Sequence, residues 1–180
     1  MPVIERAGYW MSCVIDRARR FAACLDAAGV PFAVCGGMSV MAWVTSRDPD
    51  YARTTKGVDI LMRRADLARA AEALAPHGFV FAEVNGVLAD ERVSRFETIP
   101  TPALGDVQRD DSAPWPRVPL ATLIEMKLLA MRPHDIAHIG DLLRVGLIDR
   151  AWRDRVRAEL RERFDRAYDE AERHYGDSAH

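Results

Sequence analysis

Residues 31–44 read PFAVCGGMSVMAWV, and this stretch decides the fold. Its first part, 31–35, is an apolar run that begins at a proline and has no helical period, which predicts a buried strand. Gly36 and Gly37 end this strand, and the apolar residues after them predict a short helix at 38–44. A strand that turns through glycine into a helix indicates a fold that mixes helices with a sheet.

Strands and helices alternate along the first part of the chain, and helices alone fill the second. Apolar residues recur at three- and four-residue intervals from 10 to 28 and stop before Gly29, which predicts an amphipathic first helix. The other predicted strands lie at 58–62, 79–84, 87–88 and 93–99, and Asn85-Gly86 is predicted to form a hairpin turn between two of them. A helix is predicted at 65–75, with Asp66 at its start and Gly78 at its end. Further helices are predicted at 120–131, 133–144 and 149–175. Together they predict an α+β fold, a small mixed sheet backed by helices.

Two stretches are predicted to connect these elements. Residues 46–50 form a polar loop, and residues 100–119 contain five prolines with little periodicity, which predicts an irregular connection across the surface. The length of 180 residues fits one domain. We therefore expect a single domain at 1–180, with an α/β core at 1–118 and a helical C-terminal part at 119–180.

The composition is that of an ordinary globular protein, with 49% hydrophobic and 29% charged residues. No apolar run reaches the roughly 18 residues that span a bilayer, and the first residues lack a secretion signal, so we expect a cytoplasmic protein without a membrane partner. The formal net charge of −2 supplies no general attraction for polyanions. Cys13, Cys24 and Cys35 lie in apolar stretches and are expected to be reduced core thiols.

Three segments resemble the minimal members of the DNA polymerase β-like nucleotidyltransferase superfamily, which include toxin components of some abortive-infection systems. Residues 31–44 resemble that family's strand, Gly-Gly turn and helix. Residues 53–67, RTTKGVDILMRRADL, resemble the strand that carries its Asp-x-Asp pair, and residues 120–149 resemble its C-terminal helices. The resemblance implies a nucleotidyltransferase-like fold, Mg²⁺-dependent transfer of a nucleotide from a nucleoside triphosphate to a protein or RNA acceptor, and a partner protein of the toxin–antitoxin kind.

The Asp-x-Asp pair is the chemical centre of that family's reaction. Nucleotide transfer depends mainly on positioning and on neutralising charge, and carboxylates at alternate positions of one strand share a face on which two Mg²⁺ ions are held. This chain reads Gly57-Val58-Asp59, so only the second carboxylate is present. By resemblance Asp59 is the catalytic and Mg²⁺-binding residue, and we expect its side chain to lie beside the glycine turn.

Residues near this strand are predicted to meet the phosphates of the nucleotide. Gly36 and Gly37 let the backbone approach a triphosphate, with helix amides and the Ser39 hydroxyl as donors. Arg53 and Lys56 flank the carboxylate strand and are suited to phosphate. Taken alone, the glycine pair is explained as a tight turn without a ligand, and the basic residues as solvated side chains.

The C-terminal helices supply two more candidates for nucleotide binding. Lys127 corresponds by resemblance to the family lysine that reaches the triphosphate, and Arg132, Asp135 and Asp141 match the polar pattern of the same segment. Lys127 lies in a strongly apolar helix, so its charge needs an anion or water nearby. The alternative is that its side chain snorkels to water from the edge of the helix.

Two features leave the function open. The family's third carboxylate, which activates the attacking hydroxyl, has only Glu97 and Asp106 as candidates here. The missing carboxylate at Gly57 favours a second interpretation, in which the protein keeps the fold as a binding or regulatory module without catalysis. A zinc site at His134 and His138 is disfavoured, because the acid between them is aspartate and no third ligand stands at a suitable spacing.

Overall fold

The computed structural model describes residues 3–51, 55, 57–79, 83–84, 87–88 and 107–176. The chain divides into two compact units, Met1–Ser39 with Thr54–Val118, and Val40–Arg53 with Pro119–His180. The division follows Val118, where the sequence interpretation ends the α/β core. The segment Val40–Arg53 belongs to the helical unit, although the sequence interpretation places it in the core.

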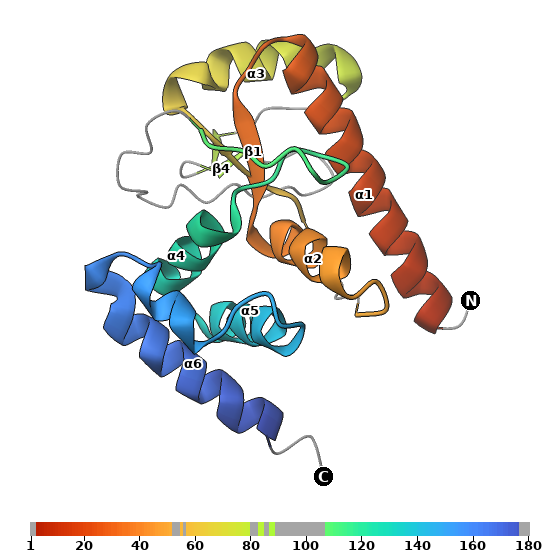
Figure 1. The fold of residues 1–180 in the computed structure, drawn as a ribbon. Helices are drawn as coiled ribbons and strands as arrows, with labels where there is room; N and C mark the ends of the chain where they lie inside the picture. Colours follow the sequence, from red (N-terminus) through yellow and green to blue (C-terminus); the bar gives the residue numbers. More distant parts are fainter. Residues whose placement is uncertain are drawn as a thin grey trace. The chain divides into compact units, whose positions relative to one another are not determined.

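The first unit contains the strands and the N-terminal helix (Figure 1). Its elements are α1 (Val3–Ala27), β1 (Phe32–Cys35), the start of α2 (Gly36–Arg47), β2 (Asp59–Met62), η1 (Arg64–Asp66), α3 (Leu67–Leu74), η2 (Ala75–His77), β3 (Glu83–Val84) and β4 (Val87–Leu88). Val84 pairs with Val87 across the predicted Asn85-Gly86 turn, so the hairpin is confirmed. The predicted strand at 93–99 lies outside the described residues.

Strand β1 is the centre of the first unit. On one side it pairs antiparallel with β2, in a register that sets Val34 opposite Ile60 and Cys35 opposite Asp59. On the other side Val34 donates its N–H to Pro116 O at 2.8 Å and accepts from Val118 N at 2.9 Å. All four residues of β1 are buried, because both its edges and both its faces are covered.

The last residues of the predicted irregular connection are therefore not on the surface, which corrects the prediction for 100–119. Residues 115–118 are buried because they supply the hydrogen bonds that the second edge of β1 needs. Arg117 is 3% exposed, and its Nε donates to Asp110 Oδ2 at 3.3 Å. Hydrogen bonds from Ser112 outweigh burial and, with the Arg117 charge, hold the pKa of Asp110 below its ordinary value.

Helix α1 covers the sheet with an apolar stripe. Leu25 and Ala18 are almost completely buried, and the rings of Phe21 and Phe32 meet edge to face with centroids 6.4 Å apart. The helix begins at Val3, earlier than the predicted position 10, and the intervening residues contain no proline. Of the three cysteines, Cys35 is buried as predicted, whereas Cys13 and Cys24 are half-buried on α1, and all three are free thiols.

The region predicted as one helix at 65–75 is a short helix between two 3₁₀ turns. Gly78 ends it with a left-handed φ of 80°, as the sequence predicts for a terminal glycine. Asp66 stands at the N-cap of α3, but its side chain makes no cap hydrogen bond. Its carboxylate instead accepts from Arg63 Nε at 2.7 Å and from Arg69 Nη2 at 3.1 Å, so Asp66 stabilises this end by pairing with arginines.

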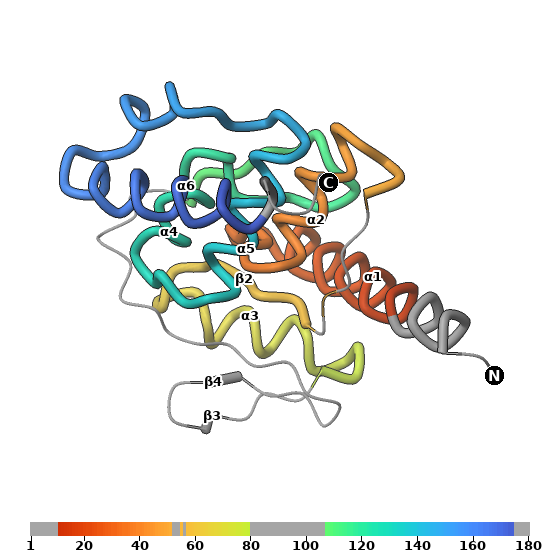
Figure 2. The backbone as a smooth tube through the Cα atoms, turned by 90° about the horizontal axis from the view of Figure 1, so that it is seen from below, coloured from red at the N-terminus to blue at the C-terminus, as the bar shows by residue number. Residues whose placement is uncertain are grey.

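The second unit is helical, as Figure 2 shows in its blue-green and blue segments. It contains the rest of α2, then α4 (Leu120–Ala130), α5 (Pro133–Arg144), η3 (Arg150–Asp154), η4 (Ala158–Leu160) and α6 (Arg161–Gly176). Helix α2 extends through Ser46 and Arg47, which the sequence predicts as loop. In this last turn the hydroxyls bond to carbonyls of the helix itself: Thr45 Oγ1 donates to Met41 O at 2.8 Å, and Ser46 Oγ donates to Trp43 O at 2.6 Å.

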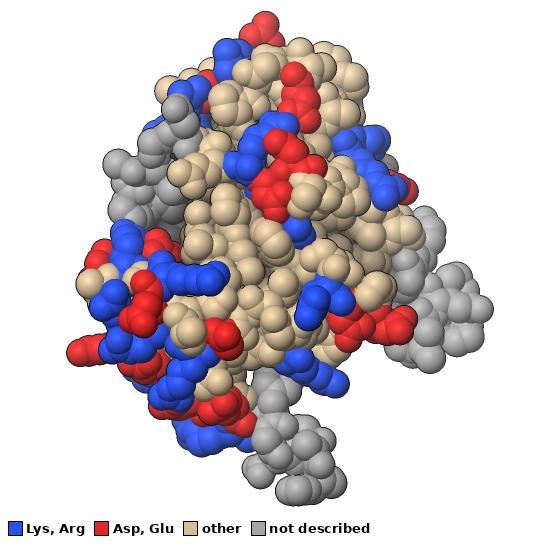
Figure 3. Space-filling model, viewed as in Figure 1, with Lys and Arg blue, Asp and Glu red and all other residues tan. Residues whose placement is uncertain are grey.

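The last predicted helix is shorter than expected. Residues 150–160 form two 3₁₀ turns, the first capped by Asp149, whose Oδ1 accepts from Ala151 N at 3.0 Å. Phe164 and Ala167 of α6 are fully buried, and most of the other residues of the helix are charged. Basic and acidic side chains intermix around α6 in Figure 3, and ion pairs such as Arg153 with Asp165 at 2.9 Å account for part of this pattern. Among the described helices, none has the length and apolar character that crossing a bilayer requires.

Candidate functional site

The candidate site of the first unit is the place where β1 turns into α2 beside the start of β2. Because Cys35 pairs with Asp59, the next residue, Gly36, lies directly against the Asp59 side chain. Gly36 has a φ of 60°, and a Cβ built at this position would overlap the carboxylate oxygen Oδ2 of Asp59. Glycine is thus required twice, by the left-handed backbone and by the close approach of a carboxylate.

Asp59 is the exposed residue of β2, in a strand whose next residue, Ile60, is buried. Alternation along a strand explains the difference, since successive side chains point to opposite faces. Carboxylates are the protein ligands that a divalent cation such as Mg²⁺ prefers, and this one is exposed against a glycine turn. We call Gly36, Gly37 and Asp59 the glycine–aspartate site.

The other glycine and the serine of the turn occupy different environments. Gly37 lies within α2 and has no positive φ. Ser39, on the first turn of α2, is completely buried, and its Oγ has no hydrogen-bond partner among the residues that the structure describes. A side chain without exposed surface makes no direct contact with a ligand in this conformation, so the Ser39 hydroxyl is a buried polar group that the fold leaves unsatisfied.

Gly57 precedes Asp59 by two residues and stands where the resembled family keeps its first carboxylate. It has no positive φ, and a Cβ built there would meet nothing within 4 Å. Its carbonyl accepts a hydrogen bond from Thr55 Oγ1 at 3.1 Å. Neither the backbone nor the packing therefore requires glycine at this position.

Magnesium is the cofactor that the resemblance implies, and the described residues do not fit a two-ion platform. Asp59 is the single carboxylate of the Gly57-Val58-Asp59 stretch. In the described part of the chain, no group of three His, Cys, Asp or Glu side chains is placed to hold a metal ion. The zinc alternative has the same difficulty, although the rings of His134 and His138 do meet, with centroids 6.0 Å apart.

Four of the sequence-predicted residues fall outside the described part of the chain. These are the phosphate candidates Arg53 and Lys56 and the third-carboxylate candidates Glu97 and Asp106. Their roles stay predictions.

Lys127, the nucleotide-binding candidate of the second unit, is a buried residue of α4. Its side chain is 8% exposed, and its Nζ lies 2.6 Å from Oδ1 of Asp135, which is 1% exposed. The snorkelling alternative is therefore wrong, since the ammonium group does not reach water from the edge of the helix. The anion that its apolar surroundings demand is a carboxylate of the next helix.

Asp135 pairs with Arg132 as well as with Lys127. Its Oδ2 accepts from Arg132 Nε at 3.0 Å and from Arg132 N at 3.3 Å, in the first turn of α5. Burial alone would raise the pKa of Asp135, but the hydrogen bond and charge of Lys127, together with Arg132, hold it below its ordinary value. Arg132 itself is 41% exposed, so its guanidinium reaches the surface while its Nε faces Asp135.

Tyr51, which no sequence pattern indicates as a site residue, binds the other buried acid of α5. Its hydroxyl donates to Asp141 Oδ1 at 2.9 Å, and the guanidinium of Arg144 stacks 4.6 Å from the centroid of its ring. Asp141 is completely buried. A charged residue among apolar neighbours in the sequence signals that some partner exists, but a partner from a loop ninety positions away leaves no local pattern.

Comparisons of the chain with protein-family models, with curated proteins and with solved structures gave no match.

Proposed function

We propose that the glycine–aspartate site binds a nucleoside triphosphate and that the protein transfers the nucleotide to a protein or RNA acceptor. The observation that carries the proposal is the contact between Asp59 and Gly36. An exposed carboxylate lies against a left-handed glycine at the start of a helix of 12 residues, where backbone amides attract phosphate. The same juxtaposition is what the resemblance of residues 31–44 and 53–67 implies.

A single carboxylate is enough for the binding part of this proposal. Nucleoside triphosphates occur as magnesium complexes, and proteins commonly hold that ion through one or two carboxylates together with the phosphates of the substrate. Asp59 would meet the cation of the nucleotide, and the amides at the start of α2 would meet its phosphates. Without the nucleotide, we expect Mg²⁺ to bind weakly, since among the described residues no group of three His, Cys, Asp or Glu side chains is placed to hold a metal ion.

A second candidate function is binding without transfer, as a regulatory module or as one member of a toxin–antitoxin pair in the cytoplasm. The glycine at position 57, where the resembled family keeps a carboxylate, favours this second function. The position is open and has no backbone demand for glycine, so the absent carboxylate is not explained by the fold. In the resembled family, the second ion of the pair activates the attacking oxygen, and this function is the one that a lone carboxylate loses first.

Labelling with nucleotide separates the two candidates. The protein would be incubated with each of the four nucleoside triphosphates, radioactive at the α-phosphate, with Mg²⁺ and either RNA or cell protein as acceptor. Label in RNA or protein that disappears with Asp59→Asn supports transfer. If Asp59→Asn incorporates label at the same rate as the natural protein, the site has no role in the transfer.

The variant Gly57→Asp adds the missing carboxylate at a position with room for it. If the natural protein binds nucleotide without labelling an acceptor, and Gly57→Asp gains labelling, the protein is a binding module derived from an enzyme. Gly57→Asn is the matched control, because it has the same size without the charge.

A further inference from the structure

We draw no further inference here: the strongest candidate, the surface cluster of exposed arginines Arg63, Arg64 and Arg69 at the start of α3, carries nothing, because Arg63 and Arg69 pair with Asp66 inside the cluster and nothing in the described part of the chain points to a ligand for it.

Discussion

At the scale of single residues, the candidate site depends on Gly36, because the Asp59 carboxylate fills the space that a side chain at position 36 would need. Gly36→Ala adds a Cβ in a left-handed conformation and into the Asp59 carboxylate. We expect the free energy of unfolding to fall by about 1–2 kcal/mol or more, measured by urea denaturation. Gly57→Ala is the matched control and should change it by less than about 0.5 kcal/mol, because its Cβ enters open space. Equal costs for the two variants would contradict the described turn.

For Ser39 we expect that truncating the side chain does not lower the free energy of unfolding. Its hydroxyl is buried without a hydrogen-bond partner, so removing the hydroxyl removes a desolvated polar group and no bond. We expect Ser39→Ala to leave the free energy of unfolding unchanged or to raise it by up to about 1 kcal/mol. A loss of more than about 1 kcal/mol would mean that the hydroxyl has a partner, such as a buried water.

At the scale of elements, α4 and α5 are joined by the Lys127–Asp135 pair. Removing one partner leaves a buried charge, so Asp135→Ala should cost about 3–5 kcal/mol in chemical denaturation. Replacing both, as Lys127→Met with Asp135→Leu, should cost clearly less than Asp135→Ala alone, because no charge is left unpaired. A double variant as unstable as the single one would contradict this explanation.

The same pair predicts how stability depends on pH. Because the pKa of Asp135 is lower in the folded protein than in the unfolded chain, its contribution is complete above the unfolded value of about 3.9 and disappears as the pH falls through the folded value. The difference in the free energy of unfolding between the natural protein and Asp135→Asn should therefore narrow below about pH 4. A difference that stays constant from neutral pH into this range would contradict the ionised pair.

Lysine reactivity reports on this pair directly. Lys56 and Lys127 are the chain's two lysines, so amine-specific labelling followed by mass spectrometry resolves each of them. In the native protein Lys127 should stay unlabelled, since its side chain is 8% exposed and paired with Asp135. Asp135→Asn should expose it to the reagent. Fast labelling of Lys127 in the folded natural protein would show that the ammonium group is not buried.

The element scale also shows what the sequence can and cannot predict. The strand at 31–35, its glycine turn and the helices at 120–131 and 133–144 follow from apolar periodicity, glycine and proline, which are local signals. The pairing of Val34 with the proline-rich segment, the partnership of Tyr51 with Asp141 and the capture of Lys127 by Asp135 depend on contacts between distant residues. Neither propensity nor spacing indicates such contacts. A charged residue in an apolar stretch of sequence therefore predicts that it has a partner, but not which residue the partner is.

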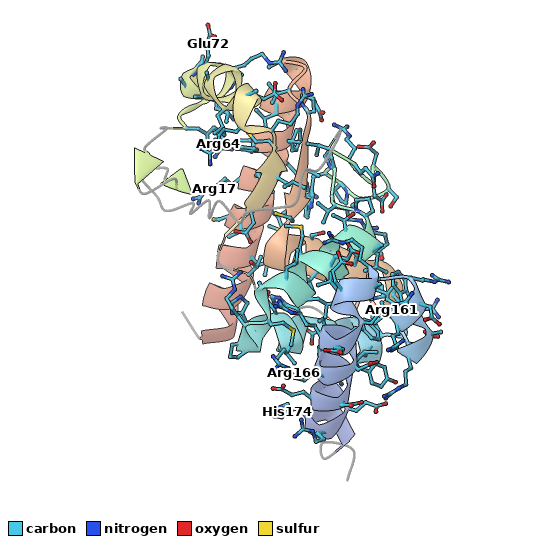
Figure 4. The ribbon with its side chains drawn as sticks, turned by 90° about the vertical axis from the view of Figure 1, so that its left-hand side faces the viewer. Arg17, Arg64, Glu72, Arg161, Arg166 and His174 are labelled. Carbon is cyan, nitrogen blue, oxygen red and sulfur yellow. The ribbon has the colours of Figure 1, made fainter. Side chains whose placement is uncertain are left out.

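Of the candidate site, the sequence indicates the glycine turn and its carboxylate but not their environments. The burial of Ser39 and the open space at Gly57 depend on packing, which no motif records. In Figure 4, Arg161, Arg166 and His174 follow one another along α6, a helix in which the sequence sets charged residues around an apolar stripe. Charge in a sequence does not tell which side chains are paired and which face a ligand.

At the scale of the whole molecule, the formal net charge is −2, so no general field draws an anionic nucleotide to the protein. Recognition of a nucleotide would therefore have to come from a local site, and the site that we propose is the glycine–aspartate site, where an exposed carboxylate lies against the start of α2. The proposed function therefore requires that this site binds nucleotide.

Calorimetric titration of the protein with magnesium ATP, CTP, GTP and UTP, repeated with Asp59→Asn, measures nucleotide binding at this site. Asp26→Asn is the control, since Asp26 is an exposed carboxylate of the same unit that pairs with Arg109. We expect that at least one nucleotide binds when Mg²⁺ is present, that Asp59→Asn weakens this binding about tenfold or more, and that Asp26→Asn does not. Binding of no nucleotide, or equal binding by the natural protein and Asp59→Asn, would contradict the proposed function.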